Sequence, residues 1–351
     1  MLNKIINFPI TISIILLLSI GILVIYSSSA SLAVQQLIFA AVGIIFFIFI
    51  SQINYSEAAN IVKGAYLFII FLLVFVLFLG FETRGSIRWI PLGVINIQPS
   101  EFAKPVMILL LGSFWLKNKP NWVNILKSIL IILPVILLVF KQPDLGTTLT
   151  ILAIWLGVLF ASRISYKKIL TVLIFISLLL PLFWFTLHDY QKQRITSFLS
   201  PERDPLGFGY NLIQSTIAVG SGQFLGRGLG YGTQSRLQFL PEYRTDFIYA
   251  TIAEEFGFLG AALILGLYAF LIGYCFKVAG SSDYLGSLLV TGVAVMLIFQ
   301  VIVNIGMNIG LLPITGITLP LISYGGSSLI ATMISLGLVA SVARVRRKEV
   351  L

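Results

Sequence analysis

About ten apolar runs, each long enough to cross a lipid bilayer, constrain this chain more than any other feature of its sequence. A helix needs about 20 predominantly apolar residues to span the hydrocarbon core. The runs are continuous rather than alternating, which excludes an outer-membrane β-barrel. The sequence therefore predicts an all-α polytopic membrane protein, a single domain over residues 1–351. We expect spans at approximately 8–26, 32–50, 64–80, 98–116, 124–140, 145–162, 167–187, 247–276, 284–310 and 324–343.

Composition agrees with this class and removes several others. Hydrophobic residues make up 58% of the chain and charged residues 10%. The net charge of +10 comes from Lys and Arg gathered in short loops, which is the pattern that sets orientation in a membrane, so nucleic acid binding is not indicated. With Cys275 as its one cysteine and His188 as its one histidine, the chain cannot build an intramolecular disulfide, a zinc site or a histidine-based triad. Acid–base chemistry therefore falls to carboxylates, lysines or tyrosines, and no organic cofactor is expected.

Alternating loop charge predicts the orientation. One set of loops and the C-terminal tail carry most Lys and Arg residues, among them Lys117, Lys119, Lys167 and Lys168. By the positive-inside rule these loops and both termini are cytoplasmic. The segment 188–246 between the seventh and eighth spans then lies outside, and it is too long for a simple connector. Its apolar stretches predict short amphipathic or re-entrant helices at the outer interface.

Asp246 is the candidate catalytic residue. It stands where the polar segment 241–246 runs back into apolar sequence, and a carboxylate at a membrane surface is costly unless it has a partner or a task. The alternative is that Asp246 only caps the following helix. Glu254 and Glu255 lie about two turns further along that helix, and acids inside a spanning helix are rare without a reason. We interpret the three acids as lining a polar groove.

Two further motifs place charges near the outer ends of predicted spans. Glu101 and Lys104 are spaced i, i+3, so they share a helix face and can pair. The pair is either a structural salt bridge between helices or the wall of a cavity that holds a polar substrate group. Asp144 joins two predicted spans, where it either caps the second one or serves in catalysis or cation binding.

Two segments are rich in glycine or proline. The glycines from Gly220 to Gly232 surround Arg227 and precede Arg236. Such backbone can present N–H groups to a phosphate, but the spacing does not fit the dinucleotide fingerprint, and a flexible hinge is the alternative. Residues 311–328 form a Pro/Gly-broken outer segment, which at membrane depth usually lines a cavity.

At these motifs the chain resembles the SEDS family (shape, elongation, division and sporulation), and most of all its elongation branch. Residues 191–214 are similar to the elongation branch, whereas Gly316–Leu321 looks more like the division branch. The matching motifs follow the family order over most of the chain. They are Gln98–Lys104, Gln142–Thr147, Asp204–Gly207, Gly232–Ser235, Thr245–Ile248, Glu254–Gly257 and Pro320–Ser328.

The resemblance implies a peptidoglycan glycosyltransferase of the bacterial inner membrane. Its substrate is lipid II, a disaccharide-pentapeptide on undecaprenyl pyrophosphate, which it polymerises into glycan strands during cell elongation. The essential aspartate of the family falls on Asp246, and its paired acid and lysine fall on Glu101 and Lys104. Members act with a class B penicillin-binding protein, a single-span transpeptidase. A divalent cation, Mg or Mn, is also implied, although no ligand cluster is legible in the sequence.

We expect Asp246 to act as general base on the acceptor hydroxyl, while cations hold the charge of the diphosphate leaving group. Glu101, Lys104 and Asp144 would wall the cavity, and the apolar spans would shelter the polyprenyl tails. The cations expected to take part are Arg194, Arg227, Arg236 and Arg244.

A lipid II flippase or transporter is the alternative function. Ten spans, broken helices and buried ion pairs are also typical of transporters. A flippase needs a polar path to the inner face, but only Glu57, Asp283 and Glu349 among the acids fall on that side. A scaffold that only recruits wall enzymes would leave the charges at membrane depth without a task.

Overall fold

Ten long helices account for most of the computed structural model, which describes residues 7–79, 81–83, 86–92, 95–203, 205 and 207–350. Each predicted span coincides with one of them, so the prediction of ten helices is confirmed within this part of the chain. The long helices are α1 Phe8–Ser28, α2 Ala30–Gln52, α3 Tyr55–Leu79, α4 Pro99–Lys117, α5 Trp122–Lys141, α6 Leu145–Ala161, α7 Tyr166–Thr186, α11 Ile248–Ala279, α12 Tyr284–Asn308 and α13 Gly326–Val350.

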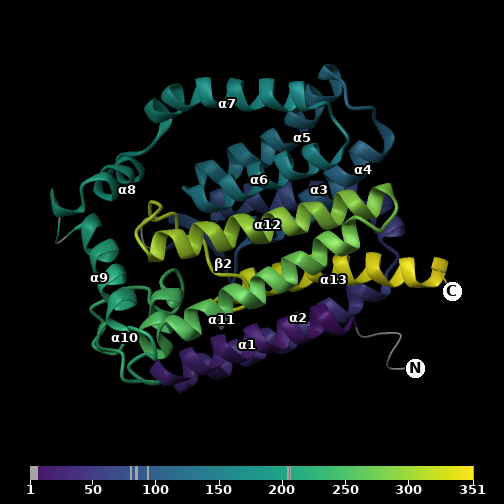
Figure 1. Ribbon diagram of the computed structural model, residues 1–351. Coiled ribbons are helices and arrows are strands. Elements are labelled where there is room, and N and C mark those ends of the chain that lie inside the picture. The colour runs from purple at the N-terminus through teal and green to yellow at the C-terminus, as the bar shows by residue number, and fades with distance from the viewer. Residues whose placement is uncertain are drawn as a thin grey trace.

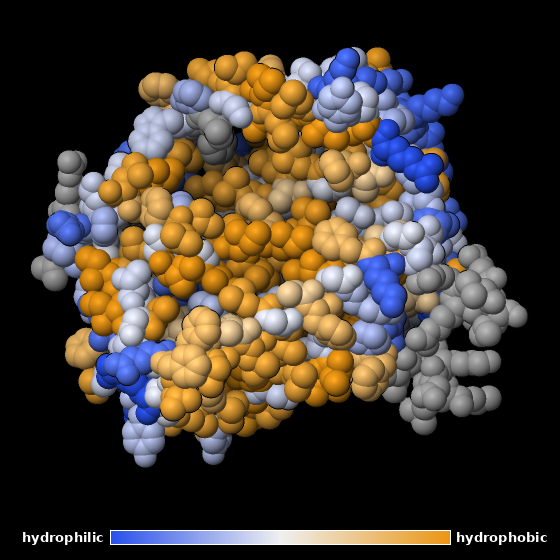
Figure 2. All heavy atoms as spheres, in the orientation of Figure 1, coloured by the Kyte–Doolittle hydropathy of each residue, from blue (hydrophilic) through white to orange (hydrophobic). Residues whose placement is uncertain are grey.

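The helices run back and forth between two ends of the molecule (Figure 1). Seven of them, in the described residues, are long and apolar enough to cross a membrane, and α6 is a shorter apolar helix. Figure 2 shows a broad apolar surface over the middle of the molecule, with hydrophilic residues gathered towards its ends. The protein is therefore a multi-pass membrane protein. Helix α1 begins and α13 ends at the same end of the bundle (Figure 1), as the predicted topology requires.

Local sequence fixes where several helices begin. The side chains of Asn121 and Asp283 accept hydrogen bonds from Asn124 N at 2.8 Å and from Gly286 N at 2.9 Å, which caps α5 and α12. Pro99 opens α4, where its missing N–H costs nothing. Long apolar runs set the helices, and polar residues at their ends set the boundaries.

Helices α12 and α13 form the centre of the bundle, and most of their described side chains are buried. Helix α12 packs against α4, α6, α11 and α13, while α13 packs mainly against α2. Helix α7 is the opposite case, and Figure 1 shows it set apart from α5 and α6. Only its first half touches the core, through Ile169, Val172 and Ile176, and nearly all its other described side chains are exposed.

A small antiparallel sheet precedes α4, and the all-α prediction did not include it. Its strands are β1 Phe81–Thr83, β2 Ser86–Leu92 and β3 Ile95–Ile97, in the order β1-β2-β3. Ile90 of β2 pairs with Ile97 of β3. Isoleucine-rich sequence favours extended backbone, but strands this short leave a weak pattern beside the long apolar runs.

Segment 188–246 folds into short helices at the end of the bundle opposite to the start of α1 (Figure 1). They are α8 Asp189–Leu199, α9 Phe208–Ser221 and α10 Thr233–Arg236, with a 3-10 turn at Pro201–Arg203. The predicted short helices are therefore present. Helix α8 carries Arg194 and α10 carries Arg236, while Arg227, Arg244 and Asp246 lie in the connections between these elements and α11.

Candidate active site

Asp246 lies just before α11 and is half-buried, at the end of the bundle that holds α8 to α10. Its Oδ2 atom lies 3.7 Å from the point where a side-chain carbon on Gly316 would stand, and Nη1 of Arg194 lies 3.9 Å from the same point. Gly316 has a φ of +76°, which favours glycine. Three segments far apart in the sequence therefore meet around one carboxylate, which is not turned into bulk solvent.

Arg194, on α8, is the cation beside this acid. Burial lowers the pKa of Arg194, while the negative charge of Asp246 and the Tyr190 side chain raise it. Its Nη1 atom donates to the carbonyl of Ile314 at 3.4 Å, and its guanidinium lies 5.8 Å from the ring centre of Tyr190. Since arginine stays protonated even when its pKa falls somewhat, the site pairs a permanent cation with an acid.

Tyr190 connects Arg194 to a second guanidinium. Its hydroxyl donates to the carbonyl of Pro143 at 3.0 Å, and the guanidinium of Arg88 contacts the same carbonyl. Arg88 also donates from Nε to the carbonyl of Gln142 at 2.8 Å. Burial raises the pKa of Tyr190, and the charges of Arg88 and Arg194 lower it. The sequence prediction did not include Arg88; its signal was a basic residue on an outer loop that carries few of them.

Asp144 does cap a helix, as one of its two interpretations required. Its Oδ1 atom accepts from Thr147 N at 3.1 Å at the start of α6. Its Oδ2 atom accepts from Gln98 Nε2 at 2.9 Å and Ser100 Oγ at 3.1 Å, at the start of α4. Asp144 is only 5% exposed. The carboxylate links the starts of α4 and α6. Because it is buried and bonded there, little of it is accessible to a substrate in the predicted cavity.

Glu101 and Lys104 pair as predicted, with Lys104 Nζ 2.5 Å from Glu101 Oε2. Both side chains are buried, at 2% exposure for Lys104 and 9% for Glu101. The pair lies within α4, so the interpretation as a bridge between helices is corrected. In the interior of a bundle the removal of one partner strands the other charge and costs about 3–5 kcal/mol.

Glu254 and Glu255 do not line an open groove, which corrects that prediction. Glu254 is wholly buried, and its carboxylate accepts from Gln234 N at 2.9 Å and Ser235 N at 3.2 Å. Glu255 accepts from Gly230 N at 3.0 Å. The glycine-rich backbone therefore does present N–H groups to anions, as expected of such segments, but these anions are the protein's own carboxylates rather than a phosphate.

The glycine-rich segment also supplies hydrogen bonds at a break in α11. Gly257 has a φ of +65° and interrupts the helix. The carbonyls of Glu254 and Glu255 accept from Arg227 N at 2.9 Å and Gly228 N at 3.0 Å, which replaces helical hydrogen bonds. A side chain on Gly257 would stand 2.3 Å from the backbone nitrogen of Gly226. Broken backbone at membrane depth is tolerated only where protein satisfies it, and here the glycine-rich segment supplies the hydrogen-bond donors.

Three of the four predicted diphosphate-binding cations have hydrogen-bond partners on other parts of the protein. Arg227 donates to Thr233 Oγ1 at 3.0 Å and Arg236 to Gly230 O at 2.5 Å. Arg244 donates to Ser28 Oγ at 2.9 Å. These contacts fasten the glycine-rich segment and the end of α1, because each guanidinium is held by nearby oxygens. Arg194, the fourth, interacts electrostatically with the Asp246 carboxylate.

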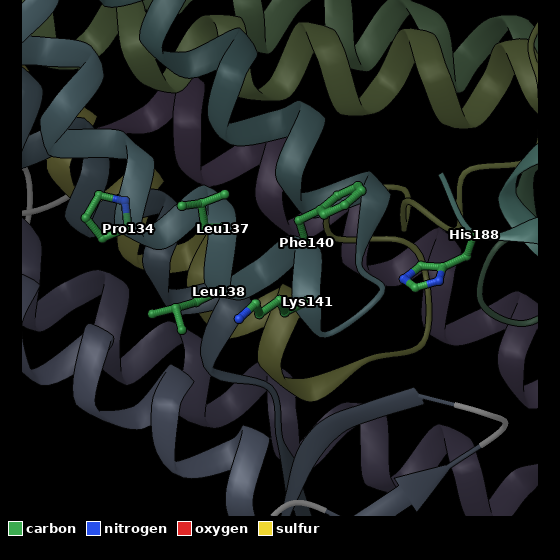
Figure 3. A pocket seen from close by; sticks show the side chains of 6 residues that line it. All are labelled: Pro134, Leu137, Leu138, Phe140, Lys141 and His188. Atoms are coloured by element: carbon green, nitrogen blue, oxygen red, sulfur yellow. The ribbon is translucent and has the colours of Figure 1, made fainter. Parts of the chain in front are cut away.

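An apolar groove of about 560 Å³ lies close to this cluster. Figure 3 shows its lining along α5, with His188 across the gap on the chain that follows α7. The His188 ring stacks on Tyr190 at 6.1 Å between centres, and Tyr190 is the residue on which Arg194 lies. The groove is lined by Pro134, Leu137, Leu138, Phe140, Lys141 and His188. The groove is thus linked to Arg194, the cation next to Asp246, through the rings of His188 and Tyr190.

The described residues contain no group of three His, Cys, Asp or Glu side chains that could hold a metal ion. Asp144 and Glu254 use both carboxylate oxygens on protein donors, and Glu101 pairs with Lys104. Glu255 uses Oε1 on protein donors, while its buried Oε2 accepts no hydrogen bond from the described part of the chain. The described carboxylates therefore do not form a built metal site.

Comparison with known proteins identifies the relatives of this arrangement. A family model described as "Cell cycle protein", FTSW_RODA_SPOVE, matches residues 3–348. The chain is 40% identical over 311 residues to the peptidoglycan glycosyltransferase MrdB of Escherichia coli K12, which covers 88% of this chain and 84% of MrdB. It is 37% identical over 356 residues to the stage V sporulation protein E of Bacillus subtilis 168, with 95% of each covered.

Solved structures give the same result. One chain from a peptidoglycan synthase complex is 33% identical and superposes with a TM-score of 0.83, covering 97% of this chain and 98% of that one. The RodA protein of Thermus thermophilus is 28% identical with a TM-score of 0.72, and 97% of each chain is covered. The family match over almost the whole length and the shared fold agree with the SEDS motifs. The chain therefore belongs to the FtsW/RodA/SpoVE family and is a RodA-like member of it.

Proposed function

We propose that this protein is a peptidoglycan glycosyltransferase that polymerises lipid II into glycan strands during cell elongation and shape maintenance. The observation that carries the proposal is the meeting of Asp246, Arg194 and Gly316 at one end of a membrane-spanning bundle. Relatives named as peptidoglycan glycosyltransferases, at 35–40% identity over most of their length, support the same reaction.

In the proposed reaction the acceptor hydroxyl attacks the anomeric carbon of the donor sugar. A carbon–oxygen bond forms there while the bond to the diphosphate breaks, and the lipid diphosphate leaves as an anion. Asp246 accepts the hydroxyl proton, and a positioned base of this kind contributes on the order of 10²–10⁴-fold. Arg194 offers N–H donors and positive charge to the diphosphate, which stabilises the charge that develops on it.

The groove beside α5 suits the lipid part of the substrate. Its apolar lining fits a polyprenyl chain, while Lys141 and His188 stand at its edge. Most described side chains of helix α7 are exposed rather than packed against α5. A lipid tail could therefore enter the groove from the bilayer on this side. Tail, diphosphate and sugar would then lie in order along His188, Tyr190, Arg194 and Asp246.

We also infer the setting of the enzyme. The positive-inside rule, applied to the basic loops, supports cytoplasmic termini and an outer position for α8 to α10 in a bacterial inner membrane. A structural relative was solved as part of a peptidoglycan synthase complex, which supports a class B penicillin-binding protein as partner. The further partners are the nascent glycan strand and membrane lipids, with no nucleic acid. A divalent cation, Mg or Mn, stays a prediction, and no step is routed through it.

Purified lipid II tests the proposal. Asp246→Asn should reduce polymerisation on the order of 10²-fold or more, because the amide cannot accept the proton. Asp189→Asn, which changes an exposed acid on α8, is the matched control and should retain activity. Near-normal polymerisation by Asp246→Asn would remove Asp246 from the base role. Transfer of lipid II across vesicles without polymerisation by the unaltered protein would favour the flippase alternative.

A further inference from the structure

Two buried asparagines on α12 hold the backbone of Asp246. Asn304 and Asn308 are one helical turn apart, and both are 0% exposed. Their Nδ2 atoms donate to the carbonyl of Asp246 at 2.9 Å and 3.0 Å respectively. This carbonyl belongs to the residue before Phe247, the N-cap of α11, and therefore lies outside the helical hydrogen-bond pattern. Side chains, rather than helix geometry, fix this peptide group.

Asn304 also binds the opposite wall of the site. Its Nδ2 atom donates to the carbonyl of Ile317 at 2.7 Å. Ile317 follows Gly316, the residue that lies beside both Asp246 Oδ2 and Arg194 Nη1. A primary amide carries two N–H donors, so Asn304 has one for the Asp246 segment and one for the Gly316 segment. Leucine or aspartate has a similar shape, but neither can bridge two carbonyls in this way.

Asn308 fixes the start of α11 from the side. Its Oδ1 atom accepts from Ala250 N at 2.9 Å, which satisfies one of the free N–H groups in the first turn of the helix. The main-chain carbonyl of Asn308 accepts a hydrogen bond from Ser215 Oγ, on α9, at 2.6 Å. The amide of Asn308 therefore holds both a donor inside α11 and the Asp246 carbonyl just before it.

We infer that Asn304 and Asn308 are positioning residues that set the spacing between the Asp246 carboxylate, Arg194 and Gly316. The inference rests on the proposed role of Asp246 as base. A base has to stand within hydrogen-bond reach of the proton that it takes, and a displacement of about 1 Å can cost on the order of 10²-fold in rate. Asn304 ties the two sides of the site to one rigid helix, which keeps that spacing constant.

A purely structural role predicts different kinetics. If the asparagines only satisfied buried carbonyls, their loss would lower the amount of folded protein but leave each folded molecule as active as before. Positioning instead acts on kcat of the folded enzyme, because the lipid-binding groove is unchanged while the base is misplaced. The separation of kcat from KM therefore distinguishes the two roles.

The test compares Asn304→Leu with Gln300→Met on purified, folded full-length protein polymerising lipid II. Gln300 lies one turn away on the same face of α12, is 1% exposed, and its Oε1 atom bonds to no described group. We expect Asn304→Leu to lower kcat on the order of 10²-fold with KM changed by less than about threefold. Gln300→Met should keep kcat within about twofold of the unaltered enzyme.

Equal kcat values for Asn304→Leu and Gln300→Met would overturn the inference, as would a change confined to KM. If Asn304→Leu does not fold, Asn304→Asp against Gln300→Glu makes the same comparison, because aspartate keeps the shape without the N–H donors. Asp246→Asn separates the two hypotheses. Activity in Asp246→Asn removes the base role, whereas an inactive Asp246→Asn beside a normal Asn304→Leu removes only the positioning role.

Discussion

Glu255 Oε1 accepts one hydrogen bond from the backbone of Gly230 and another from the hydroxyl of Ser27, each at 3.0 Å. One carboxylate thus ties the glycine-rich segment to the end of α1. Together with Glu254 it converts a segment that looks flexible in sequence into a folded part of the bundle. The charges of this region divide into those that hold the structure and those near Asp246, and mutations should separate the two sets.

Glu254→Gln should loosen the glycine-rich segment. The amide nitrogen of glutamine cannot accept the hydrogen bonds from Ser235 N and Ser235 Oγ that the carboxylate takes. Leaving buried donors unsatisfied costs about 1–3 kcal/mol each. Hydrogen exchange over residues 222–235 should become faster, while the exposed control Glu57→Gln should leave it unchanged. Unaltered exchange in Glu254→Gln would show that these contacts are dispensable.

The buried pair on α4 should behave as a unit. Lys104→Met alone strands the Glu101 carboxylate and should cost about 3–5 kcal/mol of stability. The double change Glu101→Leu with Lys104→Met should recover much of this loss, because it removes both desolvated charges. Thermal unfolding in detergent measures both effects, with the exposed Lys63→Met as control. A double variant no more stable than Lys104→Met would contradict the expectation.

Arg194 should matter more for catalysis than the other arginines of the outer segment. Arg194→Gln removes the cation beside Asp246 and should lower kcat/KM on the order of 10²-fold, the usual effect of losing one charge-stabilising donor. Arg227→Gln makes the same chemical change at an exposed site whose partners are Ser221 and Thr233. Equal losses in the two variants would argue against a special role for Arg194.

Gly316→Ala tests the space beside the carboxylate. Gly316 and Gly310 both have a φ of +76°, so alanine at either position strains the backbone by about 1–3 kcal/mol. Only the new methyl group at position 316 would stand beside Asp246 and Arg194. Both variants should lose similar stability, and Gly316→Ala should lose additional kcat/KM for lipid II. Equal losses of activity in Gly316→Ala and Gly310→Ala would argue against a catalytic site beside Gly316.

Much of the fold follows from the sequence, because the thickness of a bilayer sets the length of an apolar helix. Glu101 and Lys104 were predictable as a pair, since i, i+3 spacing puts them on one face. The hydrogen-bond partners of Glu254 and Arg236 could not be predicted. They lie in a loop whose path depends on the break in α11 at Gly257. Arg88 and Asn304 escaped notice for the same reason: their partners come from distant segments.

Most described side chains of helix α7 are exposed, and its contacts with the core come from Ile169, Val172 and Ile176. Because α7 is not tightly packed, its tilt depends mainly on the thickness of the surrounding bilayer and on the segments that connect its two ends to the bundle. A change in membrane thickness would then change the tilt of α7 while the central bundle keeps its arrangement. Lipid composition therefore bears on the orientation of α7 more than on that of any tightly packed helix.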